Sequence, residues 1–237
     1  MKRLFWISAL LLGAMVGQPA LVRAENASPA GTWQVSVMGA QKGTLMMTFS
    51  NNFTVTGYGI TRKQFGFITL AGTWSYDTKG NVVAAYLQTV NGASSAFTLT
   101  MRALSSGRFR GHATGTSGGY QCLGEQPESL PDLSGTWNAV VIRKGKPSNE
   151  QFTTTISTNY PYVFNLTGQG LSQTGSYTLS GMLMATSRDK VSATVARTIG
   201  TDTQGSSAAG VFKRARSKMT LVGSDETGAH LSEIAVR

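Results

Sequence analysis

The sequence predicts an all-β protein made of two tandem antiparallel up-and-down β-barrel domains that follow an N-terminal signal peptide. Three observations predict this fold. Apolar and polar residues alternate in many short segments, glycine is abundant (28 of 237 residues) while charged residues make up only 14%, and one short phrase occurs at both Gly31 and Gly135. Alternation with a period of two is typical of half-buried strands.

The first 24 residues have the pattern of a secretory signal peptide. Lys2 and Arg3 form a basic start, an uncharged apolar run follows, and the segment ends at Ala24 in a typical cleavage site. The alternative is a transmembrane anchor, which needs about 20 apolar residues. Gln18 and Pro19 interrupt the run too early for that. We therefore expect an exported protein that is periplasmic or secreted.

Short strands and short turns fill the rest of the chain. Alternation is clearest in residues 53–60, 96–104 and 190–197. The turns expected between strands are equally short, at 77–81, 105–107 and 143–147. We expect seven or eight strands in each half. Because consecutive strands lie so close in the sequence, they favour antiparallel hairpins, and closure into a barrel would leave no exposed edges.

An internal repeat indicates two copies of one unit. The segments that follow the two opening phrases match in the same order and with similar gaps, and Tyr177 falls where the first copy has Trp74. The expected organisation is a signal peptide, a first barrel, a proline-containing linker and a second barrel, at residues 1–24, 25–123, 124–132 and 133–237.

The opening phrases resemble those of the calycin group, which includes lipocalins, avidins and small bacterial protease inhibitors. The matching residues are Gly31, Thr32 and Trp33 in one copy and Gly135, Thr136 and Trp137 in the other. The resemblance implies eight-stranded barrels in which the Trp plugs the closed end, and a ligand in the barrel mouth or a protein partner. The candidate ligand contacts inside the barrels are Trp33, Trp74, Trp137 and Tyr177.

The reactive side chains do not favour an enzyme, a metal site or a cofactor. The two histidines, His112 and His230, lie in different copies, and the first copy's core holds one carboxylate, Asp77, inside a turn sequence. Cys122 is the sole cysteine, so no intramolecular disulfide forms. The remaining enzyme hypothesis is an isomerase or cyclase that uses confinement within the barrel.

Basic residues form the other candidate binding feature. After removal of the signal peptide, 18 of the 21 Lys and Arg residues remain against 11 Asp and Glu. Residues 214, 216 and 218 would form a basic stripe on a strand, or fan into solvent from a turn. Anionic partners such as lipid headgroups or acidic polysaccharides would suit this charge. The candidates are Arg143, Lys144, Lys146, Lys213, Arg214, Arg216 and Lys218.

Two functions therefore remain. In the first, a non-enzymatic, exported binding protein holds a small apolar ligand inside a barrel, which predicts an apolar cavity of several hundred Å³. In the second, the barrels are scaffolds whose loops bind a protein or an anionic surface polymer, which predicts filled interiors and an exposed patch. Nucleic acid is not favoured, because only 159–166 gathers aromatic residues on one face.

Overall fold

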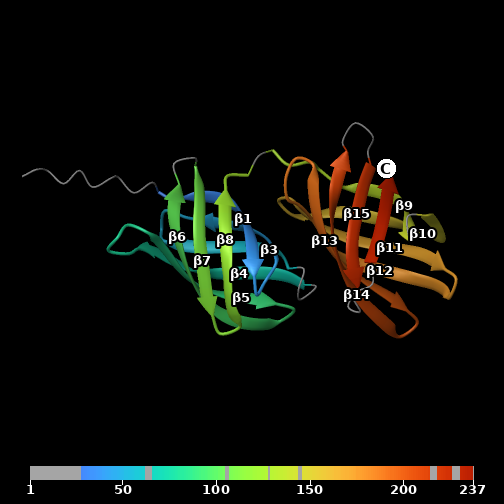
Figure 1. Ribbon diagram of the computed structural model, residues 1–237, viewed down its shortest axis with the longest axis horizontal. Coiled ribbons are helices and arrows are strands. Elements are labelled where there is room, and N and C mark those ends of the chain that lie inside the picture. Colours follow the sequence, from blue (N-terminus) through green and yellow to red (C-terminus); the bar gives the residue numbers. More distant parts are fainter. Residues whose placement is uncertain are drawn as a thin grey trace, which may run out of the picture.

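The computed structural model describes residues 28–61, 66–104, 107–127, 129–143, 146–213, 218–225 and 230–236. All regular structure in these residues is β-strand. The predicted signal peptide lies outside the described residues. Two barrels lie side by side along the long axis of the molecule (Figure 1).

The first barrel, barrel 1, contains eight antiparallel strands in simple up-and-down order, and β1 pairs with both β2 and β8 to close it. The turn predicted at 77–81 joins β4 to β5, where the Asp77 carboxylate accepts hydrogen bonds from Lys79 and Asn81. The strands are β1 (Gly31–Gly39), β2 (Gly43–Phe49), β3 (Thr54–Thr61), β4 (Gly66–Tyr76), β5 (Val82–Val90), β6 (Ala93–Leu104), β7 (Arg108–Gly115) and β8 (Gly118–Glu125).

The second barrel, barrel 2, repeats this order and closes where β16 pairs with β9. Its strands are β9 (Gly135–Arg143), β10 (Lys146–Tyr160), β11 (Val163–Ser172), β12 (Gly175–Ala185), β13 (Lys190–Ile199), β14 (Asp202–Lys213), β15 (Lys218–Asp225) and β16 (His230–Val236). The predicted fold class, an all-β pair of tandem antiparallel barrels, is confirmed.

Each barrel has its own core, formed by alternate residues that point inward. In barrel 1 the inward residues of β1 and β2 include Trp33, Val35 and Leu45, and in barrel 2 those of β9 and β10 include Trp137 and Phe152. All of these side chains are buried. Alternation in the sequence therefore corresponds to the inside and outside of each barrel. Phe53, which the alternation placed in a strand, lies instead in the β2–β3 turn with a positive φ of 63°.

Glycine permits the sharp bends that close the walls. The neighbouring strand passes close to Gly72 in β4, which we call a bend glycine, because an added Cβ there would lie 2.0 Å from the carbonyl oxygen of Ala85. Gly181 holds the corresponding place in barrel 2, 2.2 Å from the carbonyl oxygen of Thr194. Glycine kinks of this kind let a twisted sheet curve into a small barrel.

We expect Gly72→Ala to destabilise the protein by about 3 kcal/mol or more, because backbone rather than a flexible side chain occupies the required space. Gly124→Ala is the matched control. Gly124 is also buried in barrel 1, but the nearest atoms to its added Cβ lie at 3.6 Å. Urea unfolding of both variants measures the difference. Equal free energies of unfolding would contradict the close approach of the neighbouring strand at Gly72.

The two barrels pack against each other through a small apolar cluster, which we call the barrel junction. Met46 and Ile60 face outward from barrel 1 and are 1% and 0% exposed, because Val163 and Met184 of barrel 2 cover them. Outward-facing apolar residues are otherwise expected at the surface. The outer wall of β2 and β3 is therefore part of the interior of the whole molecule.

Aromatic residues surround this cluster. The Tyr160 ring stacks on the rings of Tyr58 and Phe67, with centroid distances of 4.9 and 5.5 Å. The Tyr58 hydroxyl donates a hydrogen bond to the carbonyl oxygen of Pro161 at 3.0 Å. Tyr160 and partly buried Tyr162, from the aromatic segment 159–166, thus contribute to the contact between the barrels.

A charge placed in the barrel junction should separate the barrels. Ile60→Asp would bury a carboxylate among apolar side chains, which costs several kcal/mol. Small-angle X-ray scattering should then report a longer particle, while each barrel stays folded by circular dichroism. Thr56→Asp is the control, since Thr56 lies on the same face of β3 but is exposed. If both variants scatter like the parent protein, the contact does not hold the barrels together.

Candidate functional site

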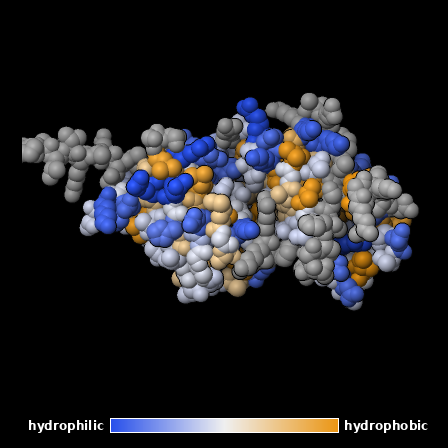
Figure 2. Space-filling view, in the orientation of Figure 1, coloured by the Kyte–Doolittle hydropathy of each residue, from blue (hydrophilic) through white to orange (hydrophobic). Residues whose placement is uncertain are grey.

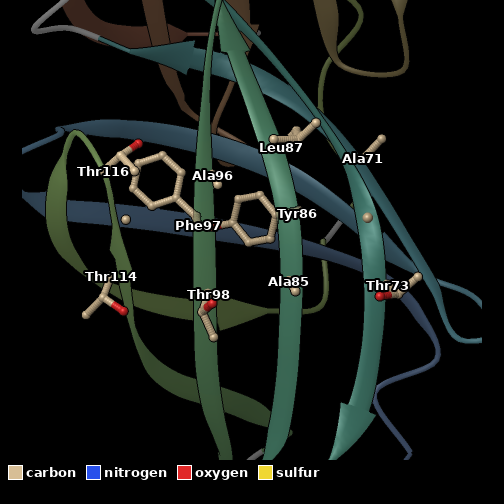
Figure 3. Close-up of a pocket in the computed structure, with 12 residues that line it drawn as sticks. Ala71, Thr73, Ala85, Tyr86, Leu87, Ala96, Phe97, Thr98, Thr114 and Thr116 are labelled. Carbon is tan, nitrogen blue, oxygen red and sulfur yellow. The ribbon is translucent and has the colours of Figure 1, made fainter.

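The outer wall of barrel 1 carries an open hollow of about 720 Å³, which we call the wall hollow. It extends across β4, β5, β6 and β7 (Figure 3). On the face shown in Figure 2, strongly hydrophilic residues gather over the upper part of barrel 1, and its lower part is coloured as weakly polar. The lining residues are Ala71, Gly72, Thr73, Ala85, Tyr86, Leu87, Ala96, Phe97, Thr98, Thr114, Gly115 and Thr116.

Strand register arranges the outward lining residues in two rows. One row contains Ala71, Leu87 and Ala96, which pair in turn across β4, β5 and β6. The other contains Thr73, Ala85, Thr98 and Thr114. Every outward side chain except Leu87 is small, so the wall is shallow there, and Leu87 is 58% exposed. None of the lining residues is charged.

Tyr86 and Phe97 line the wall hollow between the outward rows, and their side chains point into the barrel. Tyr86 and Phe97 are register partners whose rings stack with a centroid distance of 6.0 Å, and Figure 3 shows them on neighbouring strands. The Tyr86 hydroxyl hydrogen-bonds the hydroxyl of Tyr120 inside the barrel. The two rings are therefore held inside the barrel by packing and by a buried hydrogen bond.

The interior of barrel 1 also contains a buried amide pair. Gln88 Nε2 donates to Gln41 Oε1 at 3.0 Å, and the two residues are only 2% and 6% exposed. Gln88 Oε1 has no hydrogen-bond partner among the residues that the structure describes. A buried acceptor of this kind is costly and is usually satisfied by water or a ligand.

Barrel 2 has an ionic pair at the equivalent position. Tyr86 pairs with the bend glycine Gly72 and Val195 pairs with Gly181, and Gln88 and Arg197 each lie two residues further along. Arg197 forms a 3.0 Å ion pair with Glu150, and its guanidinium lies 4.2 Å from the centroid of the Tyr177 ring. Arg197 Nε has no hydrogen-bond partner among the described residues.

Burial weakens the acidity of three groups in barrel 1. Removal from water raises the pKa of Tyr120 and of the Cys122 thiol, each to about 12. The same cause, strengthened by neighbouring Tyr120, raises the pKa of Tyr86. At neutral pH all three groups are protonated, so they can donate hydrogen bonds but are poor nucleophiles.

These shifts predict alkaline instability. The ordinary pKa values are 9.0 for the thiol and 10.0 for the phenol, so above them the unfolded chain loses protons that the folded chain keeps. Stability should be full below pH 9 and fall as the pH rises toward 12. We expect Cys122→Ala and Tyr120→Phe to flatten this fall relative to each variant's own stability at pH 7, measured by urea unfolding. An unchanged slope would contradict the burial of these groups.

The structure places three of the predicted interior residues at ends of the barrels with their indole NH groups engaged. Trp33, Trp74 and Trp137 are 6%, 5% and 0% exposed. Their Nε1 atoms donate to the carbonyl oxygens of Pro29, Ser50 and Leu133 at 2.7, 3.0 and 3.0 Å. The three residues fill space near chain turns and strand starts, and they do not line the wall hollow.

Tyr177 is buried, but the expected match with Trp74 is wrong. The register places Trp74 two residues after the bend glycine Gly72, whereas Tyr177 lies four residues before Gly181. Leu183 is the residue that takes the place of Trp74 in barrel 2. The two sequence segments are similar enough to suggest that Tyr177 corresponds to Trp74, but the strand register does not align them.

The described members of the predicted basic clusters lie at strand ends. Lys213 ends β14 and Lys218 begins β15, and the two are register partners in a hairpin. Arg143 ends β9 and Lys146 begins β10, also as register partners. Arg214, Arg216 and Lys144 lie outside the described residues. The four described basic residues thus lie on two separate pairs of neighbouring strands in barrel 2.

Sequence reasoning missed the wall hollow and both buried polar pairs. Alternating small residues in 71–73, 85 and 96–98 were visible, but the hollow depends on their register across four strands. Among the described residues, no three His, Cys, Asp or Glu side chains are close enough to hold a metal ion. The described part of the chain also has no helix long and apolar enough to span a membrane.

Comparison with known proteins identifies no family for this chain. No protein-family profile matches it, and no curated protein matches it. The barrels are shown by their strand pairing, while membership of the calycin group stays a prediction.

Solved structures of other proteins align with this chain at low identity. A redesigned beta barrel bound to DFHBI aligns at 18% identity over 44% of this chain and 94% of its own, with a TM-score of 0.39. A second redesigned beta barrel aligns at 18% over 44% and 90%, with the same score. The hemagglutinin of Myxococcus xanthus, in complex with a mannopentaose, aligns at 12% over 88% and 93%, with a TM-score of 0.20.

Proposed function

We propose that the protein is an exported, non-catalytic binding protein that holds a small, uncharged, largely apolar ligand in the wall hollow of barrel 1. The observation that carries this proposal is the hollow itself. Its volume of about 720 Å³ is within the range of small-molecule sites, about 300–1,000 Å³. Its residues come from four neighbouring strands of a closed barrel, so the site is formed before the ligand binds.

The lining chemistry defines the ligand. Alanine and threonine methyl groups and exposed Leu87 offer apolar contact. The threonine hydroxyls add hydrogen bonds that fix orientation. Because no lining residue carries a charge, a charged ligand would lose water without gaining a partner. An uncharged, ring-containing or branched apolar molecule fits best.

A non-catalytic role agrees with the state of the reactive groups. A catalytic cysteine needs a lowered pKa and access to substrate. Cys122 has a raised pKa and is 2% exposed inside barrel 1. Exposed His112 on β7 has Thr100 and Gln121 as its register partners, and neither is a carboxylate that could orient the imidazole. These features support binding without chemistry.

The second candidate function is a scaffold that binds a protein or an anionic surface polymer. The packed cores of both barrels favour it, since the inward residues from β1 and β9 onward form continuous buried clusters. Lys213 and Lys218 at the β14–β15 hairpin would supply positive charge. This function predicts binding that weakens with added salt, whereas the wall hollow predicts binding that does not.

The wall hollow can be tested with Nile red, an uncharged and largely apolar dye, added to the mature protein. We expect saturable fluorescence enhancement that added salt leaves unchanged. Thr98→Phe places a large ring at the centre of the hollow, between Ala85 and Thr114. This variant should bind the dye about tenfold more weakly or worse, a loss of only about 1.4 kcal/mol.

Thr178→Phe is the matched control. Thr178 is also an exposed, outward-facing threonine on a strand, but it lies on β12 of barrel 2. Its variant should bind the dye as tightly as the parent protein. Equal weakening in both variants, or none in either, would place the dye elsewhere and overturn the proposal.

A further inference from the structure

A second hollow, of about 420 Å³, lies where the barrels meet, and we call it the junction pocket. We propose that it is a separate binding site for a small, neutral, hydroxyl-rich molecule such as a hexose unit. Both barrels and the segment that connects them line it. Its residues are Gln34, Gly107, Arg108, Glu125, Gln126, Leu130, Thr186 and Ser187.

Barrel 1 contributes a row of three polar side chains. Gln34, Glu125 and Arg108 are neighbours in register across β1, β8 and β7. Arg108 Nε lies 3.4 Å from Glu125 Oε2, and the two side chains are 53% and 47% exposed. An ion pair this exposed contributes little to stability, so both side chains are able to turn toward a bound molecule.

Barrel 2 contributes the opposite wall through its β12–β13 hairpin. Gln34 is 6% exposed because this hairpin covers it, and its Nε2 donates to the carbonyl oxygen of Thr186. The backbone NH groups of Thr186 and Ser187 both donate to the carbonyl oxygen of Lys190. The hairpin therefore presents a fixed polar edge to the row on barrel 1.

The connecting segment closes one side of the pocket and is itself anchored. Leu130 and Leu133 are buried in the core of barrel 2, and the Leu133 carbonyl oxygen accepts the indole NH of Trp137. Gln126 follows directly after β8. Since neither barrel alone has all these walls, the pocket exists only in the docked pair. Junctions between domains are common places for ligand sites.

The polar groups define the class of ligand. Arg108 and Gln34 supply hydrogen-bond donors, while Glu125 and Ser187 supply acceptors on facing walls. The charges of Arg108 and Glu125 cancel, so the pocket has no preference for an anion or a cation. A molecule with many neighbouring hydroxyl groups can both donate and accept at short range, and charge-assisted bonds to Arg and Glu are the stronger kind. A neutral sugar matches this pattern, and an apolar ligand does not.

Saturation-transfer NMR on the mature protein tests the site with D-glucose, D-mannose and D-galactose as probes. We expect at least one hexose to bind. Arg108→Gln and Glu125→Gln should each weaken that binding about tenfold, as expected for losing a hydrogen bond to a charged group. Ser187→Tyr, which fills the pocket from the side of barrel 2, should abolish it.

Arg102→Gln is the matched control, because Arg102 is an exposed arginine on β6 that does not line the pocket. It should leave hexose binding unchanged. Thr98→Phe, which blocks the wall hollow, should also leave it unchanged, so this proposal and the proposed function fail separately. The inference would be overturned if none of the three hexoses binds, or if the pocket variants bind a hexose as tightly as the parent protein does. Stronger binding of D-glucuronate or glycylglycine than of any hexose would also overturn it.

Discussion

Closure of each sheet into an eight-stranded barrel is the constraint on which the rest of the structure depends. A closed barrel pairs the backbone of every strand on both sides, so no edge is left to bind another strand. With eight strands the interior is just wide enough for side chains to fill it. Trp33 and Leu45 in one barrel, and Trp137 and Phe152 in the other, belong to such packed interiors. Because the interiors are filled, the two proposed sites lie on the outer wall of barrel 1 and between the barrels.

The outer wall is divided between two uses. On β2 and β3, Met46 and Ile60 make the wall of barrel 1 apolar, and barrel 2 covers them. On β4 to β7, alanine and threonine keep the wall low and uncharged, and it stays open. The same strand geometry serves for docking on one side and for a hollow on the other. The outward side chains differ in size and in polarity.

Much of the fold could be predicted from the sequence because a closed barrel requires patterns that are visible in short stretches of sequence. Inward residues alternate, turns such as the one at Asp77 carry their own hydrogen-bonding side chain, and the repeat marks both copies. Alternation tells which side of a strand a residue faces, but not what covers that side. Ile60 therefore could not be distinguished from an exposed residue. The burial of Tyr160 against Tyr58 and Phe67 depends on the docking of two barrels, which no local pattern encodes.

The candidate sites were harder to predict for the same reason. The wall hollow requires Thr98, Ala85 and Thr114 to be neighbours, and they come from three strands. For Tyr177 the sequence suggested too much. The similarity of the two segments predicted that Tyr177 corresponds to Trp74, and the strand register does not support this. Register is a property of paired strands, and a shift of one strand against its neighbour changes every contact without changing local alternation.

The two barrels differ at several inward positions, and the polar pair is the difference that changes the charge of the interior. Gln88 pairs with a neutral amide beside the first hairpin of barrel 1, while Arg197 pairs with Glu150 on a much longer strand, since β10 has 15 residues and β2 has 7. Burial of an ion pair costs more desolvation free energy than burial of an amide pair, and the ion pair tolerates fewer changes around it. In barrel 2, the ion pair limits which residues the interior can hold. The contact with barrel 1 limits which residues Val163 and Met184 can be replaced by. Barrel 1, with a neutral interior and an open wall on β4 to β7, is the copy that carries the proposed wall site.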